Sequence, residues 1–316
     1  MPKLLVYLAL GALLWLLCAH YAHDALRWVG FFRFLGEPSG FSIGEGWLRF
    51  ESGDAYWLAF LAGLINTLRL ALLAIVLSSL LGGVLGLGRL SHNLLLRALS
   101  VAYVEFFRNI PLLLQLLAWY FLLTELLPAA NEAYSFASSF YLSKSGLAFP
   151  FPVWQSSPTG HFFFWDVPAR QAWNIGGGAR LTPEFLAVLL GLVCYSSAYL
   201  AEIVRAGVSA IPPGQSEAAS ALGLSSAQTL RRVVLPQALR IMLPPASNQF
   251  LNLLKNTSLG VAIGYPELVS VANTTLNQTG RALECVSLIV LIYLVISLTL
   301  SAFLAWFNQS LRQKAR

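Results

Sequence analysis

Polar and ionisable side chains lie inside long apolar segments of this 316-residue sequence, and they are its strongest candidates for chemistry. Asn248, Asn252 and Lys255 follow one another at helical intervals, which places them on one helix face. Such groups are costly in lipid and are expected to face protein or water. Two interpretations have equal weight. The stripe, with Thr257 and Ser258 after it, either lines a translocation pathway in which Lys255 attracts a carboxylate, or packs against a second subunit.

A second polar group lies on the segment 183–210, where Tyr199 is followed by Glu202 and Arg205. Glu202 and Arg205 are spaced to pair on one helix face, and this intrahelical ion pair is the favoured interpretation. The alternative places Glu202, with Tyr199, beside a pathway, where its carboxylate attracts an ammonium group. Glu105 and Arg108 have the same spacing, and an ion pair is expected there too.

Catalytic and cofactor-binding motifs are missing from the sequence. It contains no GxxxxGK[ST] loop to cradle ATP phosphates, no HExxH and no serine elbow. Cys18, Cys194 and Cys285 sit in apolar runs without metal-ligand spacing. We therefore predict no catalytic residue, no metal and no cofactor in this chain.

The composition indicates a membrane protein. Hydrophobic residues make up 57% of the chain and charged residues 11%, whereas a soluble domain carries about a quarter charged residues. The mean hydropathy is +0.67. These values exclude a soluble enzyme and a disordered scaffold. The net charge of +6 comes without a basic stripe with interleaved aromatic residues, so no nucleic-acid partner is expected.

Several segments are apolar enough to cross a hydrocarbon core of about 30 Å. We predict an all-α integral membrane fold with six transmembrane helices, one N-terminal helix and a five-helix core. The first segment also resembles a signal peptide, but retention as a helix is favoured over cleavage. The predicted spans are 4–19, 57–88, 110–127, 183–210, 238–263 and 284–307. The predicted divisions are an N-terminal helix 1–22, an external loop 23–56, a first core part 57–127, an external loop 128–182 and a second core part 183–316.

Lys and Arg residues orient the predicted spans. They crowd the short segments on one side of the membrane and are sparse in the two long loops on the other, which predicts both termini on the cytoplasmic side. The external loop 128–182 is dense in aromatic residues, and its Pro, Gly and Ser content argues against a seventh span. It is interpreted as a cap lying on the interfacial aromatic belt, in preference to a surface for docking a partner.

The cytoplasmic segment 211–236 is longer than a simple chain reversal needs. Ser216 is expected to cap a short helix with Glu217 in its first turn, and Gly223 to end that helix in a left-handed conformation. Ser225 and Gln228 predict a capping box for a second helix. The segment is either a rigid knob that fits a groove on another protein or an interfacial amphipathic helix.

This segment resembles the EAA loop of ABC importer permeases, in which Glu-Ala-Ala is followed by a glycine and then by Leu-Pro. The resemblance implies that the loop couples the permease to a cytoplasmic ATPase. It also implies that ATP and Mg²⁺ bind in partner subunits. The residues that carry it are Glu217, Ala218, Ala219, Gly223 and Pro236.

The stretches Asn66–Leu72, Glu105–Gln115, Ser197–Gly223 and Leu243–Leu259 resemble polar amino acid uptake permeases, and the long external loop is most similar to the general L-amino acid permeases. The resemblance implies a permease subunit for L-amino acids in the bacterial inner membrane. Its implied partners are ABC ATPase subunits, a related second permease subunit, a periplasmic amino-acid-binding protein and membrane lipid. The alternative is an ATP-independent secondary transporter or channel, which typically shows inverted repeats that we do not find.

Overall fold

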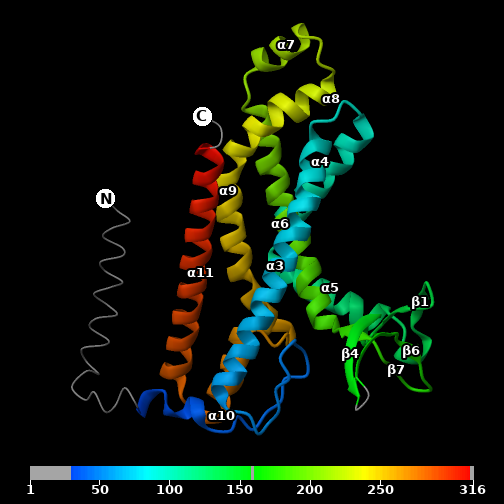
Figure 1. Ribbon diagram of the computed structural model, residues 1–316, viewed down its shortest axis with the longest axis vertical. Coiled ribbons are helices and arrows are strands. Elements are labelled where there is room, and N and C mark those ends of the chain that lie inside the picture. The colour runs from blue at the N-terminus through cyan, green and yellow to red at the C-terminus, as the bar shows by residue number, and fades with distance from the viewer. Residues whose placement is uncertain (1–29, 158–159, 314–316) are drawn as a thin grey trace.

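The computed structural model describes residues 30–157 and 160–313 as a mostly helical protein (Figure 1). Within these residues, three helices are long and apolar enough to cross a membrane: α3 (Tyr56–Arg89), α6 (Pro183–Ser209) and α11 (Ala282–Gln313). They confirm helices at three predicted spans. The predicted helix 4–19 lies outside the described residues. The count of six spans is therefore not established, and the fold is described as a mostly helical membrane protein.

The third predicted span is longer than expected and bent. It consists of α4 (Leu94–Asn109) and α5 (Leu112–Phe121), which meet at 103° and count as one span if taken together. Asn93 caps α4 by accepting hydrogen bonds from two backbone N–H groups. Pro111 causes the break because it has no N–H and forces the preceding residue out of the helical region. The expected start at residue 110 is thus wrong, and α4 was missed.

The fifth predicted span falls on α9 (Leu235–Asn256), which includes Pro244 and Pro245, and on the 3₁₀ helix η5 (Thr257–Ile263). Neither is among the described helices that are long and apolar enough to cross a membrane. A further helix that the hydropathy did not indicate, α10 (Leu268–Thr279), follows η5. The shorter elements are η1 (Arg33–Gly36), the π-helical turn η2 (Leu122–Leu126) and η3 (Ala130–Glu132).

Two glycines bring α3 and α6 together. A Cβ at Gly82 would lie 2.7 Å from the Cβ of Leu200, and one at Gly86 would lie 2.6 Å from that of Val204. Neither position has room for a side chain, so the glycines allow the two helices to pack closely. Gly83 faces open space and takes no part in it.

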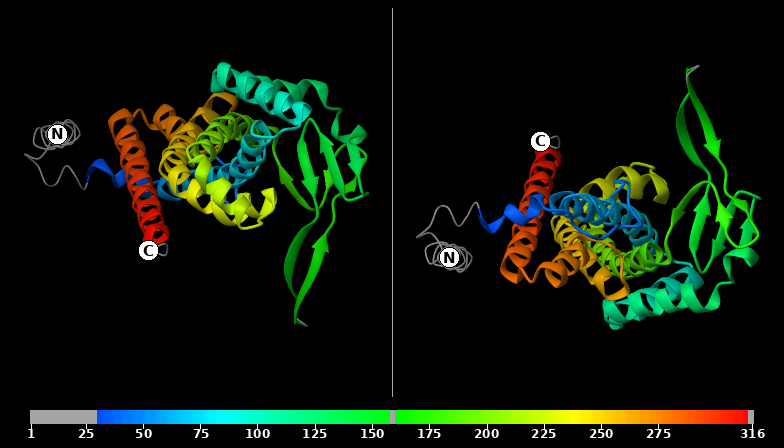
Figure 2. Two further views of the ribbon diagram at one scale, coloured as in Figure 1. Left: turned by 90° about the horizontal axis from the view of Figure 1, so that it is seen from above. Right: turned by 90° about the horizontal axis from the view of Figure 1, so that it is seen from below.

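Apart from the short helix η3, the ordered elements of the segment 128–182 are strands, so the all-α prediction is wrong there. Its aromatic residues form short antiparallel strands, a structure in which aromatic side chains are favoured. One sheet has the order β1-β2-β3-β8, and two hairpins, β4–β5 and β6–β7, stand beside it (Figure 2). The strands are β1 (Tyr134–Phe136), β2 (Phe140–Ser143), β3 (Gly146–Phe149), β4 (Phe151–Ser157), β5 (Gly160–Asp166), β6 (Ala169–Arg170), β7 (Ile175–Gly176) and β8 (Ala179–Leu181).

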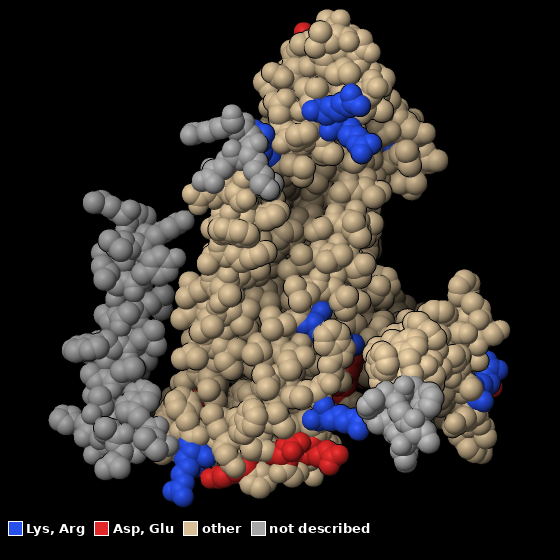
Figure 3. Space-filling view, viewed as in Figure 1, with Lys and Arg blue, Asp and Glu red and all other residues tan. Residues whose placement is uncertain are grey.

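The two ends of the helical bundle carry different secondary-structure elements. One end, here called the loop end, carries α7 (Pro213–Ala221) and α8 (Ser226–Thr229). The opposite end, the strand end, carries the strands and α10. Figure 3 shows Lys and Arg side chains at both ends, while most acidic side chains visible on that face lie at the strand end.

Candidate functional site

The short helix α7 stands at the tip of the loop end (Figure 1). It begins at Pro213, a position that proline favours because the first helical N–H needs no partner. The expectation that Ser216 caps the helix is therefore wrong. Ser216 lies inside the first turns, where its carbonyl accepts a hydrogen bond from the Ser220 hydroxyl at 2.9 Å.

Gly223 ends α7 in the left-handed conformation that the sequence predicts, with φ +78°. Its N–H donates to the carbonyl of Ser220 at 2.9 Å. The N–H of Leu224 donates to the carbonyl of Ala219 at 3.1 Å. This pair of bonds is the Schellman arrangement, which satisfies two carbonyls at the helix end and fixes the direction of the chain beyond it.

A capping box starts α8, as predicted. The N–H of Gln228 donates to Ser225 Oγ at 3.3 Å, and the N–H of Ser225 donates to Gln228 Oε1 at 2.9 Å. The chain continues through a π-helical turn, η4 (Leu230–Val234), into α9. The helical run from α8 therefore continues past Pro236, which lies in the first turn of α9.

Solvent-exposed residues on and just after α7 form the surface that this loop presents. Glu217 and Ala218 are exposed, whereas Ala219 is buried and holds α7 against the rest of the loop. Leu222, which sequence analysis passed over, is 82% exposed directly after α7. A carboxylate, a small apolar body and an exposed leucine are thus held on one rigid unit.

Glu202 lies in an ion-pair cluster near the loop end. It pairs with Arg205 on its own helix, as predicted, and also with Arg89 at the end of α3. The Arg89 side chain is only 13% exposed, so the cluster joins α3 to α6 under limited solvent access. Sequence spacing gave no sign of Arg89, because the two residues are 113 positions apart.

Tyr199 connects α6 to the bent span. The Arg108 guanidinium lies over its ring at 5.2 Å, a cation–π contact, and the Tyr195 hydroxyl donates to the Tyr199 hydroxyl at 3.3 Å. Within the described residues, Arg108 forms no ion pair with Glu105, so that expectation is wrong.

The polar stripe predicted on one helix face lies on α9 and is exposed. Asn248, Asn252 and Lys255 are all exposed on this single chain. The two hydroxyl residues after them lie in η5 and turn back to their own backbone: Thr257 is fully buried and donates to the carbonyl of Leu254, while Ser258 donates to that of Lys255. The structure therefore groups the two asparagines with Lys255 and separates Thr257 from them.

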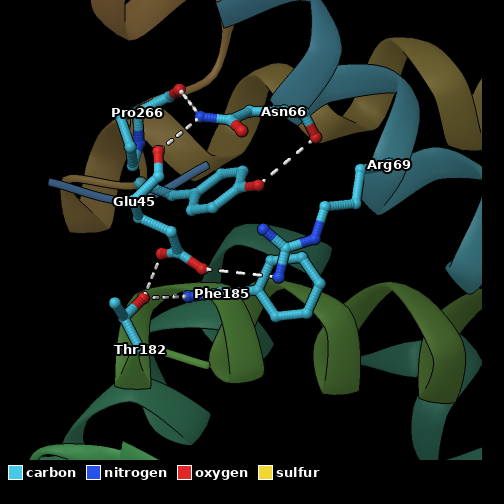
Figure 4. Close-up of polar contacts among 7 residues, drawn as sticks. Glu45, Asn66, Arg69, Thr182, Phe185 and Pro266 are labelled. Atoms are coloured by element: carbon cyan, nitrogen blue, oxygen red, sulfur yellow. Dashed lines mark hydrogen bonds and ion pairs between the residues drawn. The ribbon is translucent and has the colours of Figure 1, made fainter. Parts of the chain in front are cut away.

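A buried polar cluster at the strand end was not predicted (Figure 4). Glu45, in the segment before α3, pairs with Arg69 of α3 at 3.9 Å, with side chains 7% and 8% exposed. The Thr182 hydroxyl donates to Glu45, and the Arg69 guanidinium lies 4.3 Å from the centre of the Phe185 ring. Burial raises the pKa of Glu45, while the Thr182 hydroxyl and the Arg69 charge oppose that rise.

Asn66 ties the same segment to the chain before α10. Its side-chain amide donates to the carbonyl of Glu45 at 3.0 Å and to that of Pro266 at 2.9 Å. Asn66 and Arg69 are less than one turn apart in a mostly apolar helix, and this spacing was the sequence signal available for the cluster. The role of this cluster is structural, because it fixes the segment before α3 onto α3 and onto Thr182, the cap of α6.

Comparisons with known proteins agree with this architecture. Residues 74–313 match the family described as "Binding-protein-dependent transport system inner membrane component". The chain is 40% identical to YhdX of Escherichia coli (strain K12), which is named as an amino-acid ABC transporter permease protein, over 88% of this chain and 84% of that protein. It is 38% identical to the general L-amino acid transport system permease protein AapQ of Rhizobium johnstonii, over 88% and 82%.

Solved structures extend the comparison to the fold. The chain resembles one in a crystal structure of an amino acid ABC transporter, with TM-score 0.59 and 30% identity over 81% of this chain and 95% of that one. It shares the fold of a chain of the MetNI methionine ABC transporter, with TM-score 0.56 and 16% identity over 80% and 96%. The family model and the level of identity show that the chain belongs to the family of binding-protein-dependent transport system inner membrane components. It is a permease subunit and not an ATPase.

Proposed function

We propose that this chain is a permease subunit that carries L-amino acids across the bacterial inner membrane, driven by ATP hydrolysis in separate ATPase subunits. The loop 211–236 carries this proposal, because it is too elaborate for a chain reversal. A Schellman turn and a capping box hold α7 rigidly at the tip of the bundle. A rigid element of this kind transmits motion, whereas an interfacial helix needs no fixed turn at its end.

The exposed surface of α7 suits docking into a groove of an ATPase subunit. Glu217 gives this surface one charge, Ala218 lets a partner approach closely, and Leu222 offers an exposed apolar anchor. In this proposal the ATPase subunits hold ATP and Mg²⁺, and their closure moves α7. Pro236 and the π-helical turn before it connect that movement to α9.

The polar stripe of α9 supports a second permease subunit. Asn248, Asn252 and Lys255 are exposed at a depth where lipid contact is costly, so a cavity or a partner must cover them. We propose a pathway between two related permease subunits, lined by this stripe and by Tyr199. Lys255 then attracts the substrate carboxylate. Glu202 is retained as a candidate, although its two arginine partners favour the ion-pair interpretation.

The proposed orientation places the loop end in the cytoplasm. Arg231 and Arg232 of η4 and Arg89 at the end of α3 lie at that end and support it, since cytoplasmic segments are enriched in Lys and Arg. The strand end then faces the periplasm, where an amino-acid-binding protein delivers substrate. Both termini are cytoplasmic in this arrangement, with six spans of which the first lies outside the described residues.

Reconstitution tests the proposal. The chain, co-expressed with its neighbouring ATPase, permease and binding-protein genes, is placed in proteoliposomes and assayed with a panel of radiolabelled L-amino acids. Uptake that requires both ATP and the binding protein is expected. Uptake by the chain alone, driven by an ion gradient without ATP, would establish the alternative of a secondary transporter.

Lys255→Ala tests the pathway in the same vesicles. Loss of uptake with normal assembly is expected, because the cationic group that attracts the carboxylate is removed. Lys144→Ala is the matched control, since Lys144 is an exposed lysine in the segment 128–182. Normal transport of the whole panel by Lys255→Ala would remove the stripe from the pathway.

A further inference from the structure

The hairpin of β4 and β5 carries three large aromatic side chains side by side on one face. Trp154 lies opposite Phe163, and Pro152 lies opposite Trp165, in the antiparallel register. Directly opposed residues share a face, and so do residues two apart on one strand, so these four side chains point the same way. We call Trp154, Phe163 and Trp165 the aromatic face.

The aromatic face is contiguous and exposed. Ring centres are 5.3 Å apart between Trp154 and Phe163 and 6.0 Å apart between Phe163 and Trp165. The three residues are 71%, 50% and 58% exposed respectively. A patch of this kind on a protein surface marks contact with another apolar or amphipathic surface.

The composition of the hairpin distinguishes between possible contacts. Residues 151–165 include no Lys, Arg, Asp or Glu, and Asp166 at the base lies opposite Phe151 on the other face. Protein interfaces are also rich in aromatic residues, but they add arginine, a polar rim and charged groups that select the partner, and residues 151–165 supply no arginine or other charged side chain of these kinds. Tryptophan and phenylalanine without charge are instead typical of residues at the headgroup level of a bilayer.

The position of the hairpin agrees with its composition. It stands at the strand end, at the level where α5 ends (Figure 1). Seen along the long axis of the bundle, it runs sideways away from the helices (Figure 2). Phe121 and Leu126, at the end of the bent span, are also exposed apolar residues. The hairpin therefore extends roughly parallel to the membrane surface at the end of the spanning helices.

We propose that the aromatic face lies in the headgroup layer of the outer leaflet and anchors the strand end on the lipid surface. This inference rests on the membrane orientation of the proposed function, but it does not depend on what is transported. The amphipathic indole ring of Trp154 suits a layer that is apolar on one side and wet on the other. Anchoring there would hold the external sheet at a fixed height beside the helices.

Fluorescence quenching in vesicles tests the anchor. The assembled transporter is reconstituted in phosphatidylcholine brominated near the carbonyl ends of its acyl chains, and wild type is compared with Trp154→Phe. The difference between the fluorescence of the wild type and that of the variant reports on Trp154 alone. We expect this signal to be quenched by the brominated lipid and protected from iodide in the water. Quenching by iodide without quenching by the lipid would overturn the proposal.

Paired substitutions provide a second readout. Trp154→Ser with Phe163→Ser removes two rings of the aromatic face, and Val153→Ser with Phe164→Ser changes the opposite face of the same hairpin. We expect only the first pair to increase proteolytic cleavage of the hairpin in vesicles. Equal cleavage of both pairs would contradict the anchor.

Two further outcomes are informative. Protection of Trp154 from both iodide and brominated lipid would place a protein on the aromatic face and overturn the lipid assignment. ATP-driven uptake is measured in the same vesicles, so its absence with lipid quenching intact would reject the proposed function and leave the anchor standing.

Discussion

Replacing Gly223 by alanine tests whether a rigid loop end is needed for coupling. Gly223 has φ +78°, and nothing lies within 4 Å of the position that a Cβ would occupy. The substitution therefore adds a backbone cost without a steric clash. A left-handed conformation costs an L-residue about 1–2 kcal/mol. This cost falls on the Schellman turn, and it lowers the ratio of formed to unformed turn roughly 5- to 30-fold.

Gly223→Ala is therefore expected to reduce transport, and three further variants test whether the left-handed turn is the cause. Gly214→Ala changes a glycine inside α7 that also faces open space and lacks a positive φ, so it should transport normally. Gly223→Asn should recover much of the loss, because asparagine tolerates the left-handed region. Gly223→Pro should lose the most, since proline fixes φ near −65° and removes the N–H that bonds Ser220.

Uptake and substrate-stimulated ATPase are measured per assembled complex in proteoliposomes, with membrane insertion quantified separately. Uptake should fall in the order Gly214→Ala, Gly223→Asn, Gly223→Ala, Gly223→Pro, with insertion unchanged. If Gly223→Ala and Gly223→Pro both transport at the wild-type rate, a fixed turn is not required and the reasoning is refuted.

The remaining predictions concern stability, measured by unfolding of the solubilised complex. Glu202→Gln should lower the free energy of unfolding by about 1–3 kcal/mol, because the largely buried Arg89 loses its carboxylate partner. Arg205→Gln should lower it by less than about 1 kcal/mol, because Arg205 is more exposed. Equal losses for the two variants would contradict the cluster as described. Burial raises the pKa of Glu267, the cap of α10, from 4.5 to about 7. The folded state therefore holds this proton more tightly, so the stabilisation is complete below about pH 4.5 and is lost as pH rises through 7, by about 3 kcal/mol in all. Glu267→Gln should remove this pH dependence, and a variant with the wild-type pH profile would rule out Glu267 as its source.

The local features of the loop could be predicted because their signals lie within a few residues of one another. A glycine that ends a helix and a Ser–Gln capping box need only the chain around them. The start of α7 was misplaced for the same reason. Ser216 and Pro213 are both acceptable at a helix start, and the sequence did not show that proline would take the first position.

Hydropathy predicted α3, α6 and α11, since an apolar run of membrane length has few other stable structures. It did not predict α4, which is amphipathic and carries charge, nor the strands of 128–182. Aromatic density there was interpreted as a property of a loop. Alternation of side chains between two faces of a hairpin becomes visible only once the register is known.

The sequence by itself determined that this protein lies in a membrane, which loop resembles a coupling element, and which face of α9 is polar. These properties depend on composition and short spacing. Only the tertiary structure decided the partners of the charges: Arg89 for Glu202, and Arg69 for Glu45. A buried charge is stable only where another element supplies its counter-charge, and such contacts join residues far apart in the chain. They are set by how helices pack, which local sequence does not encode.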